Sequence, residues 1–347
     1  MIKEAIQKLT EKKDLSFDET KEIFNDIFDH KISATQTASF LTALSMKGET
    51  AEEIYAAATV VRDRATRLSV QGDFIGIELD SEQILDSCGT GGSGVNKFNI
   101  STAVAFIVAA SGVKVAKHGN RAMSSTCGSA DVLEELGIKI DIAPKIMEET
   151  IKKTGIGFLY APLYHPVLKE AAAIRKEIGA RTIFNILGPL CNPAHATHQL
   201  LGVYKKELVR PMAEVLNSLG TKKALVVYGK DLKDEVSLTG ETTAALIEKK
   251  KVKNMAINPS DFGLKKITLK SIETKDASSS AKIILDVLNG KKGPAQDIIL
   301  ANASCCFYIL DKANNFKEGA ALARSIIEKG KARDKFFEFK NFIDAQR

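Results

Sequence analysis

Two short glycine-containing segments are the residues of this chain best suited to chemistry. One reads GTGG at residues 89–92, and the other reads KHGNR at residues 117–121. The apolar run 103–110 follows the first segment and predicts a buried helix. Glycine permits positive φ and a close backbone approach, and the free N–H groups at a helix start attract anions. The GTGG segment therefore predicts a phosphate-binding loop.

The second segment decides between this interpretation and a plain turn. Taken alone, GTGG favours an ordinary turn before a helix capped by Ser101 or Thr102. However, residues 113–116 predict a strand that leads into KHGNR, and SSTCGSAD at 124–131 predicts another helix start. Two neighbouring helix starts, with a lysine and an arginine between them, suit two linked phosphate groups. We therefore expect a diphosphate ligand.

Two further segments complete the pattern. Residues 175–193 read RKEIGARTIFNILGPLCNP, and an acidic pair, Asp234 and Glu235, follows later. Together the four segments resemble the anthranilate phosphoribosyltransferase family, whose pattern joins GTGG to N-x-ST, KHGNR to GSAD, and an arginine-led run to LGPL-x-NP. The resemblance extends over nearly the full length. Long motifs in a fixed order are far more specific than one glycine fingerprint.

The resemblance implies a Mg²⁺-dependent pentosyltransferase of tryptophan biosynthesis. Such an enzyme moves the 5-phosphoribosyl group of phosphoribosyl diphosphate (PRPP) to the amine of anthranilate, giving N-(5-phosphoribosyl)anthranilate and diphosphate. Breaking the bond to diphosphate leaves negative charge on the leaving group and positive charge on the ribose ring. We therefore expect Mg²⁺, backbone N–H groups and cationic side chains around the diphosphate.

The resemblance also implies which residues bind each ligand. The expected metal ligands are Ser101, Asp234 and Glu235, because Mg²⁺ prefers oxygen ligands and keeps several waters. Taken alone, two adjacent carboxylates are ordinary surface residues, and only the other motifs favour a metal site. The residues expected at anthranilate are Gly89, His118, Asn120, Arg175 and Pro189. The residues expected at PRPP are Gly89, Gly92, Ser93, Lys97, Asn99, Ile100, Ser101, Thr102, Lys117, His118, Gly119, Asn120, Arg121, Ser124, Ser125 and Ser129.

Arg175 is expected to bind the anthranilate carboxylate. A guanidinium can donate two parallel hydrogen bonds to a carboxylate, although an arginine on an amphipathic helix is more often a surface residue. His118 is expected to line the same pocket, and a lone histidine is more often structural. We assign no general base, because the amine of anthranilate loses its proton easily once it has attacked.

Two positions beside the expected diphosphate depart from the family pattern. The family usually has aspartate where this chain has Ser93, and commonly a small hydroxyl residue where it has Lys97. Serine removes a negative charge that helps to recruit metal, and lysine adds a positive charge. We therefore expect the phosphate loop to depend less on Mg²⁺ for neutralisation.

The elements that must position these residues follow from apolar periodicity. The first seventy or so residues predict helices only, with capping boxes beginning at Ser16 and Thr50. From residue 84 onward, short apolar runs alternate with helical stretches, which indicates an α/β domain with parallel strands and crossover helices. The apolar stripe after His165 predicts one further helix up to Gly179.

We expect two domains in an α/β fold. One is a small all-helical N-terminal domain and the other a large α/β domain with a mostly parallel central sheet, and a three-segment hinge joins them. The small domain is expected to comprise residues 1–73 with 164–188, and the large one residues 74–163 with 189–347. The resemblance places the hinge near residues 72–80, 161–165 and 185–192.

Composition narrows the class of protein. With 347 residues and 44% hydrophobic content, the chain can bury one large core and a smaller one. No segment is long and apolar enough to span a bilayer, the N-terminus does not read as a signal peptide, and the five cysteines suit a reducing compartment, so we expect a cytoplasmic enzyme. The resemblance implies a homodimer, and the sequence leaves association with an anthranilate synthase open.

Two alternative functions are compatible with parts of the sequence. A pyrimidine nucleoside phosphorylase has a similar architecture and phosphate loop, but KHGNR and the run at 185–189 follow the anthranilate family. A noncatalytic nucleic-acid-binding relative would use the net charge of +6 and the basic run 249–253. This charge is the small remainder of 49 basic and 43 acidic residues, and the basic run predicts a solvated strand end or turn. We expect neither nucleic-acid nor membrane binding.

Overall fold

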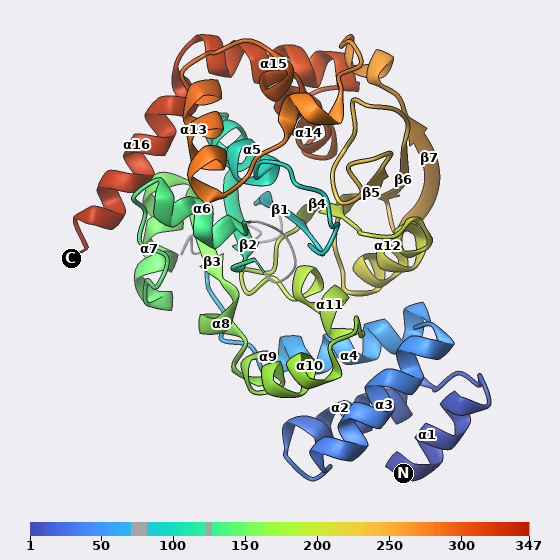
Figure 1. Ribbon diagram of the computed structural model, residues 1–347. Helices are drawn as coiled ribbons and strands as arrows, with labels where there is room; N and C mark the ends of the chain where they lie inside the picture. The colour runs from blue at the N-terminus through green and yellow to red at the C-terminus, as the bar shows by residue number, and fades with distance from the viewer. Residues whose placement is uncertain (71–81, 123–126, 347) are drawn as a thin grey trace.

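Four helices open the chain. The computed structural model describes residues 1–70, 82–122 and 127–346, and begins with α1 (Ile2–Thr10), α2 (Phe17–Phe28), α3 (Ala34–Lys47) and α4 (Ala51–Asp63) (Figure 1). The side chains of Ser16, Ser33 and Thr50 each accept a hydrogen bond from the N–H three residues later and so cap α2, α3 and α4. The helical N-terminal segment and both expected capping boxes are confirmed.

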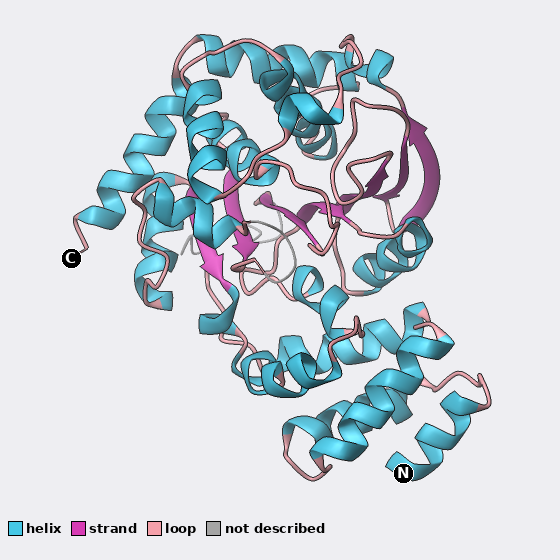
Figure 2. Cartoon of the chain, viewed as in Figure 1, coloured by secondary structure: helices cyan, strands magenta, loops and turns pink. Residues whose placement is uncertain are grey.

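A seven-stranded sheet forms the centre of the rest of the described chain (Figure 2). Its strand order is β3-β2-β1-β4-β5-β6-β7; the first five are parallel, and β6 and β7 are antiparallel to their neighbours. This confirms a mostly parallel central sheet. The strands are β1 (Ile84–Gly89), β2 (Lys114–Gly119), β3 (Ile156–Tyr160), β4 (His198–Gly202), β5 (Lys223–Gly229), β6 (Thr242–Glu248) and β7 (Lys251–Ile257).

Both faces of the sheet are covered by helices, as the alternation along β5 shows. Leu225 and Val227 belong to one buried apolar cluster, and Ala224 and Val226 to a second. Successive strand residues point to opposite faces, so the two clusters lie on opposite sides of the sheet. The first includes residues of α5 (Ile100–Ala109), α6 (Ser129–Glu135), α7 (Pro144–Thr154), α13 (Ala277–Leu288), α14 (Pro294–Ile309), α15 (Phe316–Glu328) and α16 (Lys331–Asp344).

The second cluster joins the sheet to the N-terminal helices. It contains apolar residues of α1 to α4, of α12 (Val209–Ser218), and of the connecting segment that follows β3. Figure 1 shows the N-terminal helices together below the sheet, beside that segment. The helical segment is therefore packed against one face of the α/β part of the chain.

The connecting segment differs from the expectation. The expected helical segment with Pro166 at its first position is confirmed, but one continuous helix from His165 to Gly179 is wrong: the chain forms α9 (Pro166–Glu170) and α10 (Ala172–Ile178), separated at Ala171. No proline or glycine stands at Ala171 to explain the break. The segment also contains α8 (Ala161–Tyr164) and α11 (Phe184–Leu187).

The basic run 249–253 lies where a strand ends. Lys249 and Lys250 have positive φ and form the turn between β6 and β7, which confirms the expected strand-end position of the basic run. The expected hinge segment at 72–80 lies outside the described residues. In the parts of the chain that the structure describes, no helix is both long and apolar enough to cross a membrane.

The strand order indicates which edge of the sheet binds a ligand. β1, β2 and β4 end on Gly89, Gly119 and Gly202, and parallel strands bring these carboxyl ends to the same edge. From β1 the chain builds β2 and β3 to one side, whereas β4 and β5 lie on the other. Open α/β sheets bind ligands at such a reversal of strand order. The edge between β1 and β4 is therefore the expected site.

Candidate active site

A cleft of about 380 Å³ lies at this edge of the sheet. Both glycine-containing segments line it, together with the acidic pair, Arg175 on α10, and Pro189. The volume is in the usual range for a site that holds a small-molecule ligand. Segments far apart in the sequence thus meet at a single cavity, as the family resemblance implied.

The loop after β1 has the geometry of an anion site. Gly91, Gly92 and Gly94 all have positive φ, between 66° and 69°, which only glycine adopts freely. The loop leads to the start of α5, where Asn99 is the capping residue: its Oδ1 accepts hydrogen bonds from the Thr102 N–H at 3.1 Å and the Thr102 hydroxyl at 2.7 Å. The alternative that Ser101 or Thr102 caps this helix is therefore wrong.

The second loop brings a buried lysine beneath the first. Lys117 on β2 donates hydrogen bonds to the Ser87 carbonyl oxygen at 2.6 Å and to Ser101 Oγ at 2.9 Å. Burial lowers the pKa of Lys117, while the nearby Asp86 carboxylate acts in the opposite direction. The Lys117 ammonium is thus fixed where β1, β2 and α5 begin to diverge.

Glycines let the second loop close on α6. A β-carbon on Gly128 would lie 2.5 Å from the backbone of residues 120–122, and one on Gly119 would lie 2.2 Å from Ser129 Oγ. Both distances are well below any normal contact, so only glycine allows this packing. Ser129, at the first turn of α6, is thereby held at the cleft wall.

Arg121 lines the cleft but is already engaged by carboxylates. Its guanidinium donates to Glu134 at 2.5 and 2.7 Å and to Asp131 at 3.1 Å, and it lies over the Tyr160 ring. These partners hold the side chain against α6 and β3. The sequence predicts Arg121 as a cation between two phosphate sites, and in the structure its charge is shared with two acidic residues.

The acidic pair reaches the first loop because three strands end on glycine. Asp234 and Glu235 lie on the connection between β5 and β6. A β-carbon on Gly202 would lie 1.9 Å from the Asp234 carbonyl oxygen, one on Gly229 2.3 Å from the Glu235 carbonyl oxygen, and one on Gly89 3.2 Å from Asp234 Oδ2. The main chain of the acidic pair therefore rests directly on the strand ends.

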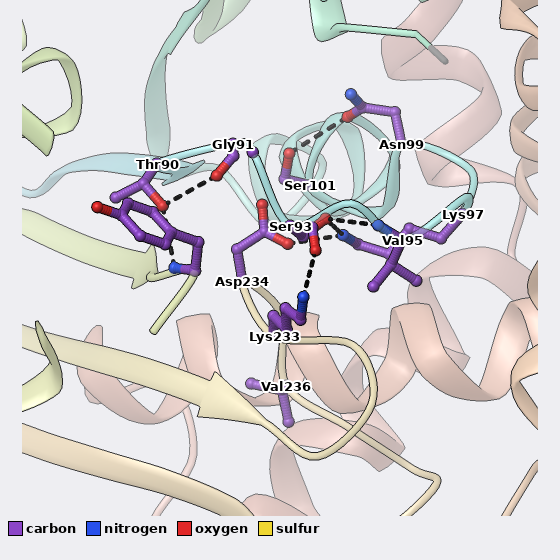
Figure 3. Close-up of polar contacts among 12 residues, drawn as sticks. Thr90, Gly91, Ser93, Val95, Lys97, Asn99, Ser101, Lys233, Asp234 and Val236 are labelled. Carbon is purple, nitrogen blue, oxygen red and sulfur yellow. Dashed lines mark hydrogen bonds and ion pairs between the residues drawn. The ribbon is translucent and has the colours of Figure 1, made fainter. Parts of the chain in front are cut away.

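Two lysines bind the acidic connection to the phosphate loop (Figure 3). Lys97 Nζ lies 2.7 Å from Asp234 Oδ1 and 3.3 Å from Ser93 Oγ, and Lys233 donates to the Ser93 carbonyl oxygen at 2.6 Å. Burial alone would lower the pKa of Lys97, but Asp234 and Glu235 outweigh it and raise that pKa. Lys97 is therefore a charged group in the acidic site.

The residues around the acidic pair suit a Mg²⁺ ion with few protein ligands. Ser101, Asp234 and Glu235 all line the cleft. Within residues 1–70, 82–122 and 127–346 there is no group of three or more His, Cys, Asp or Glu side chains arranged for a metal. Burial raises the pKa of Glu235 to about 7. Mg²⁺ commonly takes one or two carboxylates plus waters and substrate phosphates, so this set fits such an ion.

Arg175, Phe184 and two histidines line the opposite part of the cleft. The Arg175 guanidinium lies over the Phe184 ring, 6.0 Å from its centroid, and burial lowers the pKa of Arg175. His118 and His165 meet edge to face with ring centroids 5.1 Å apart. Burial lowers the pKa of His118 well below its ordinary value and that of His165 to about 4, so both rings are neutral at neutral pH.

Residues that sequence reasoning missed support this part of the cleft. Gln199 on β4 donates to the Pro189 carbonyl oxygen at 2.7 Å and to Asp86 Oδ2 at 3.4 Å, and Asp86 Oδ1 accepts from the His118 N–H at 3.1 Å. This chain of hydrogen bonds connects two expected anthranilate residues. The available signal was an acid and an amide beside the short apolar pairs 84–85 and 200–201.

The sequence indicates His165 only as the start of a helix. In the structure it is buried and lines the cleft, and neither ring nitrogen has a hydrogen-bond partner of normal geometry among the described residues. Its neighbour Pro166 begins α9. Buried nitrogens of this kind in a cavity are positions where a ligand or water supplies hydrogen bonds.

Most of the expected site residues line this one cleft. Two do not: Ile100 and Thr102 are buried in α5 beneath the loop. Ser124 and Ser125 lie outside the described residues. Those that line the cleft are Gly89, Gly92, Ser93, Lys97, Asn99, Ser101, Lys117, His118, Gly119, Asn120, Arg121, Ser129, Arg175, Pro189, Asp234 and Glu235.

Comparisons with known proteins agree with this architecture. Residues 3–65 match the helical bundle domain of a glycosyl transferase family, and residues 81–333 match the a/b domain of that family. An anthranilate phosphoribosyltransferase of Geobacter sp. (strain M21) is 50% identical over 337 residues, which are 96% of each chain. That of Petrotoga mobilis is 45% identical over 349 residues, covering 100% of this chain and 99% of the relative.

Solved structures give the same result. The anthranilate phosphoribosyltransferase of Thermus thermophilus superposes with a TM-score of 0.89 at 37% identity, covering 98% of this chain and 99% of that one. The enzyme of Saccharomyces cerevisiae, solved in complex with PRPP and Mg, has a TM-score of 0.87 at 29% identity, covering 99% of this chain and 98% of that one.

Proposed function

The chain belongs to the anthranilate phosphoribosyltransferase family, and on this premise we propose that it transfers the 5-phosphoribosyl group of PRPP to the amine of anthranilate, releasing diphosphate. One observation carries the proposal. A single cleft contains two anion-binding loops, an acidic pair, and an arginine on the far wall. These are the groups needed by a doubly charged leaving group and by an aromatic acid.

The diphosphate is proposed to lie between the two loops. Gly91 and Gly92, both with positive φ, line the cleft and permit close approach to the backbone, and the start of α5 adds N–H groups and the positive end of the helix dipole. Lys117 and Lys97 supply positive charge nearby. Charge that develops on the leaving diphosphate is stabilised by groups already in place, which lowers the barrier to breaking the ribose bond.

Ser101, Asp234 and Glu235 are proposed to hold Mg²⁺. The bound ion would neutralise charge on the diphosphate as it leaves. Ser101 is oriented by Lys117, whose ammonium donates to its Oγ, so the hydroxyl oxygen keeps a lone pair for a cation. Asp234 and Glu235 are held at this position by the glycines beneath them.

Anthranilate is proposed to lie between Arg175 and the second loop. Arg175 would bind its carboxylate, and His118, Asn120, Pro189 and the Gly89 backbone would surround the ring and amine. His118 is neutral because its pKa is lowered by burial, by His165 and by Lys117. A ring whose pKa is lowered is a weak proton acceptor, so His118 is proposed to orient the acceptor and no general base is assigned.

Two aspects of the assembly are also proposals. Residues 1–73 with 164–188 form the small domain, and residues 74–163 with 189–347 form the large one. The helical bundle match, residues 3–65, lies within the first part, and the a/b match, residues 81–333, covers most of the second part and also residues 164–188. The chain forms a homodimer in the cytoplasm, and size-exclusion chromatography with light scattering measures the oligomeric state. Association with an anthranilate synthase is tested by mixing the two purified proteins on the same column.

The decisive experiment follows the loss of anthranilate fluorescence when the protein is mixed with PRPP, Mg²⁺ and anthranilate. The wild-type protein should consume anthranilate only when PRPP and Mg²⁺ are both present. The double variant Asp234→Ala with Glu235→Ala should lose metal-dependent turnover, and Arg175→Ala should weaken the use of anthranilate more than that of PRPP.

A matched control separates these effects from general damage. Arg210 is an exposed arginine on α12 that pairs with Glu214 and does not line the cleft. Arg210→Ala should retain wild-type turnover. A chain that leaves PRPP untouched with anthranilate and related aminobenzoates would refute the proposed function, as would the reverse pattern for the Arg175 and acidic-pair variants.

A further inference from the structure

Lys97 pairs with Asp234, a carboxylate that would be expected to be free to bind metal. Its Nζ lies 2.7 Å from Asp234 Oδ1, and the exposed fractions of the two side chains are 9% and 11%. Figure 3 shows the Lys97 side chain extending across the phosphate loop to reach Ser93 and Asp234. The contact is therefore a shielded ion pair inside the cleft and not a surface pair.

Other groups also hold the acidic segment against the phosphate loop, so this structural task does not by itself explain Lys97. Lys233 connects the acidic segment to the phosphate loop through the Ser93 carbonyl oxygen at 2.6 Å. Gly89, Gly202 and Gly229 let the acidic main chain rest on the strand ends. Lys97 is thus one of several groups that bring the two segments together, and of the two lysines it is the one whose ammonium lies on a carboxylate oxygen.

A lysine ammonium and a divalent cation seek the same carboxylate oxygens. An ammonium is a compact point charge on a flexible stem, so it can pair with a carboxylate and turn to a phosphate when one arrives. At a hydrogen-bond distance, the interaction of two unit charges is worth more than one factor of ten in affinity, even at the effective dielectric constant of a protein surface. Lys97 must therefore be displaced from Asp234 before a metal can use both Asp234 oxygens.

We propose that Lys97 is a resident cation that competes with divalent metal for the Asp234–Glu235 pair and itself neutralises part of the diphosphate charge. This inference rests on the proposed function and extends it to the regulation of the same site by metal. In the protein without ligands, Lys97 keeps metal affinity low. With PRPP present, its ammonium lies beside the phosphate loop and reduces the need for metal there.

The first test measures Mn²⁺ binding to the purified protein by electron paramagnetic resonance, without PRPP or anthranilate. Lys97→Met keeps the apolar stem and removes the charge, and it should bind Mn²⁺ about tenfold more tightly than the wild-type protein. Lys97→Arg keeps the charge and should bind Mn²⁺ as weakly as the wild-type protein does. Lys291→Met is the matched control, because Lys291 pairs with Asp286, is 69% exposed and does not line the cleft, and it should stay within about twofold of wild type.

The gain must come from the acidic pair. Adding Asp234→Asn to Lys97→Met should abolish the tighter Mn²⁺ binding. Lys97→Thr provides a second uncharged variant, since a small hydroxyl residue is common at this position in the family pattern, and it should behave as Lys97→Met does. Equal Mn²⁺ affinity in folded Lys97→Met, Lys97→Thr and wild-type protein overturns the proposal.

The second test measures PRPP binding by titration calorimetry at low and at high Mg²⁺. Lys97→Met should bind PRPP about tenfold more weakly at low Mg²⁺ and recover at high Mg²⁺. A loss of the same size at both concentrations contradicts a charge-sharing role. Wild-type protein that binds no PRPP refutes the proposed function instead, and the Mn²⁺ measurement, which uses no substrate, then still decides the competition at Asp234.

Discussion

The substitution Gly202→Ala is the most direct test of how the acidic pair is positioned. The added methyl carbon would lie 1.9 Å from the Asp234 carbonyl oxygen and 2.3 Å from its carbonyl carbon, whereas real contacts of this kind stay above 3.0 Å. Both partners are main-chain atoms, so no change of side-chain rotamer relieves the overlap. The segment that carries Asp234 and Glu235 must retreat from β4 by about 1 Å.

The size of the effect follows from this displacement. Overfilling a packed site costs about 1–3 kcal/mol, and we expect Gly202→Ala to fall near the upper end because backbone must move against backbone. A shift of about 1 Å in a catalytic group can cost about 100-fold in rate. We therefore expect the free energy of unfolding to fall by about 2–3 kcal/mol and kcat/KM for PRPP to fall by about 100-fold.

A series of glycine variants gives the measurement its internal control. Urea unfolding followed by circular dichroism reports stability, and anthranilate fluorescence reports turnover. Gly229→Ala, whose β-carbon would lie 2.3 Å from the Glu235 carbonyl oxygen, should resemble Gly202→Ala. Gly89→Ala has its closest contact at 3.2 Å, with a side-chain oxygen, and should lose much less stability. At Gly188 a β-carbon meets nothing within 4 Å, so Gly188→Ala should unfold as the wild type does.

The outcome that refutes this reasoning is specific. Wild-type stability and turnover in Gly202→Ala would mean that the acidic segment does not rest on β4 as described. A larger stability loss in Gly89→Ala than in Gly202→Ala would also contradict the steric ranking.

Three further predictions concern the two ends of the cleft. Arg175→Ala should raise KM for anthranilate by about 30-fold or more, because a charge-assisted hydrogen bond contributes about 2 kcal/mol, and KM for PRPP should change little. Steady-state titration of each substrate measures the two constants, and an equal rise in both argues against the assignment. Burial raises the pKa of Glu235 from 4.5 to about 7, so the folded protein holds this proton more tightly than the unfolded chain does, and the associated stability is lost as pH rises between those values. Between about pH 4 and about pH 8, the free energy of unfolding of metal-free Glu235→Gln should therefore fall by about 2 kcal/mol less than that of the wild type, after allowance for partial exposure. Parallel profiles of unfolding free energy against pH for the two proteins would disprove this. Burial lowers the pKa values of His118 and His165, the latter to about 4. His118→Asn should therefore lower the rate without removing any inflection near pH 7 from the pH–rate profile. Loss of such an inflection would instead identify His118 as a titrating group.

Local patterns predicted the elements and the loops that carry the site. Capping boxes at Ser16 and Thr50, the apolar run of α5 and the glycine loops each depend on residues close in sequence, and the structure contains them. The helix expected from His165 to Gly179 failed at Ala171, where no residue type marks the break. The alternative that placed the cap of α5 at Ser101 or Thr102 missed Asn99 by two or three residues, because Asn, Ser and Thr are all good capping residues and all occur between 99 and 102.

Contacts between distant segments were beyond the reach of those patterns. The Lys97–Asp234 pair joins residues 137 positions apart, and the Arg181 guanidinium reaches the Gly92 carbonyl oxygen across 89 positions. Arg121 looked like a free phosphate ligand because nothing local shows that α6 presents Glu134 to it. His165 joins His118 only because β2 and β3 are neighbours in the sheet.

The amino-acid sequence by itself determined the class of reaction, the helical start, the alternating α/β pattern and the identity of the loop residues, because each of these is written in short motifs and in apolar periodicity. Only the tertiary structure decided which charges meet. Strand order and the close approach allowed by glycines at strand ends bring Lys97 to Asp234, and the pairing of β1 with β4 brings Gln199 to Asp86. Such distances are set by how the layers pack, and no local run of residues encodes them.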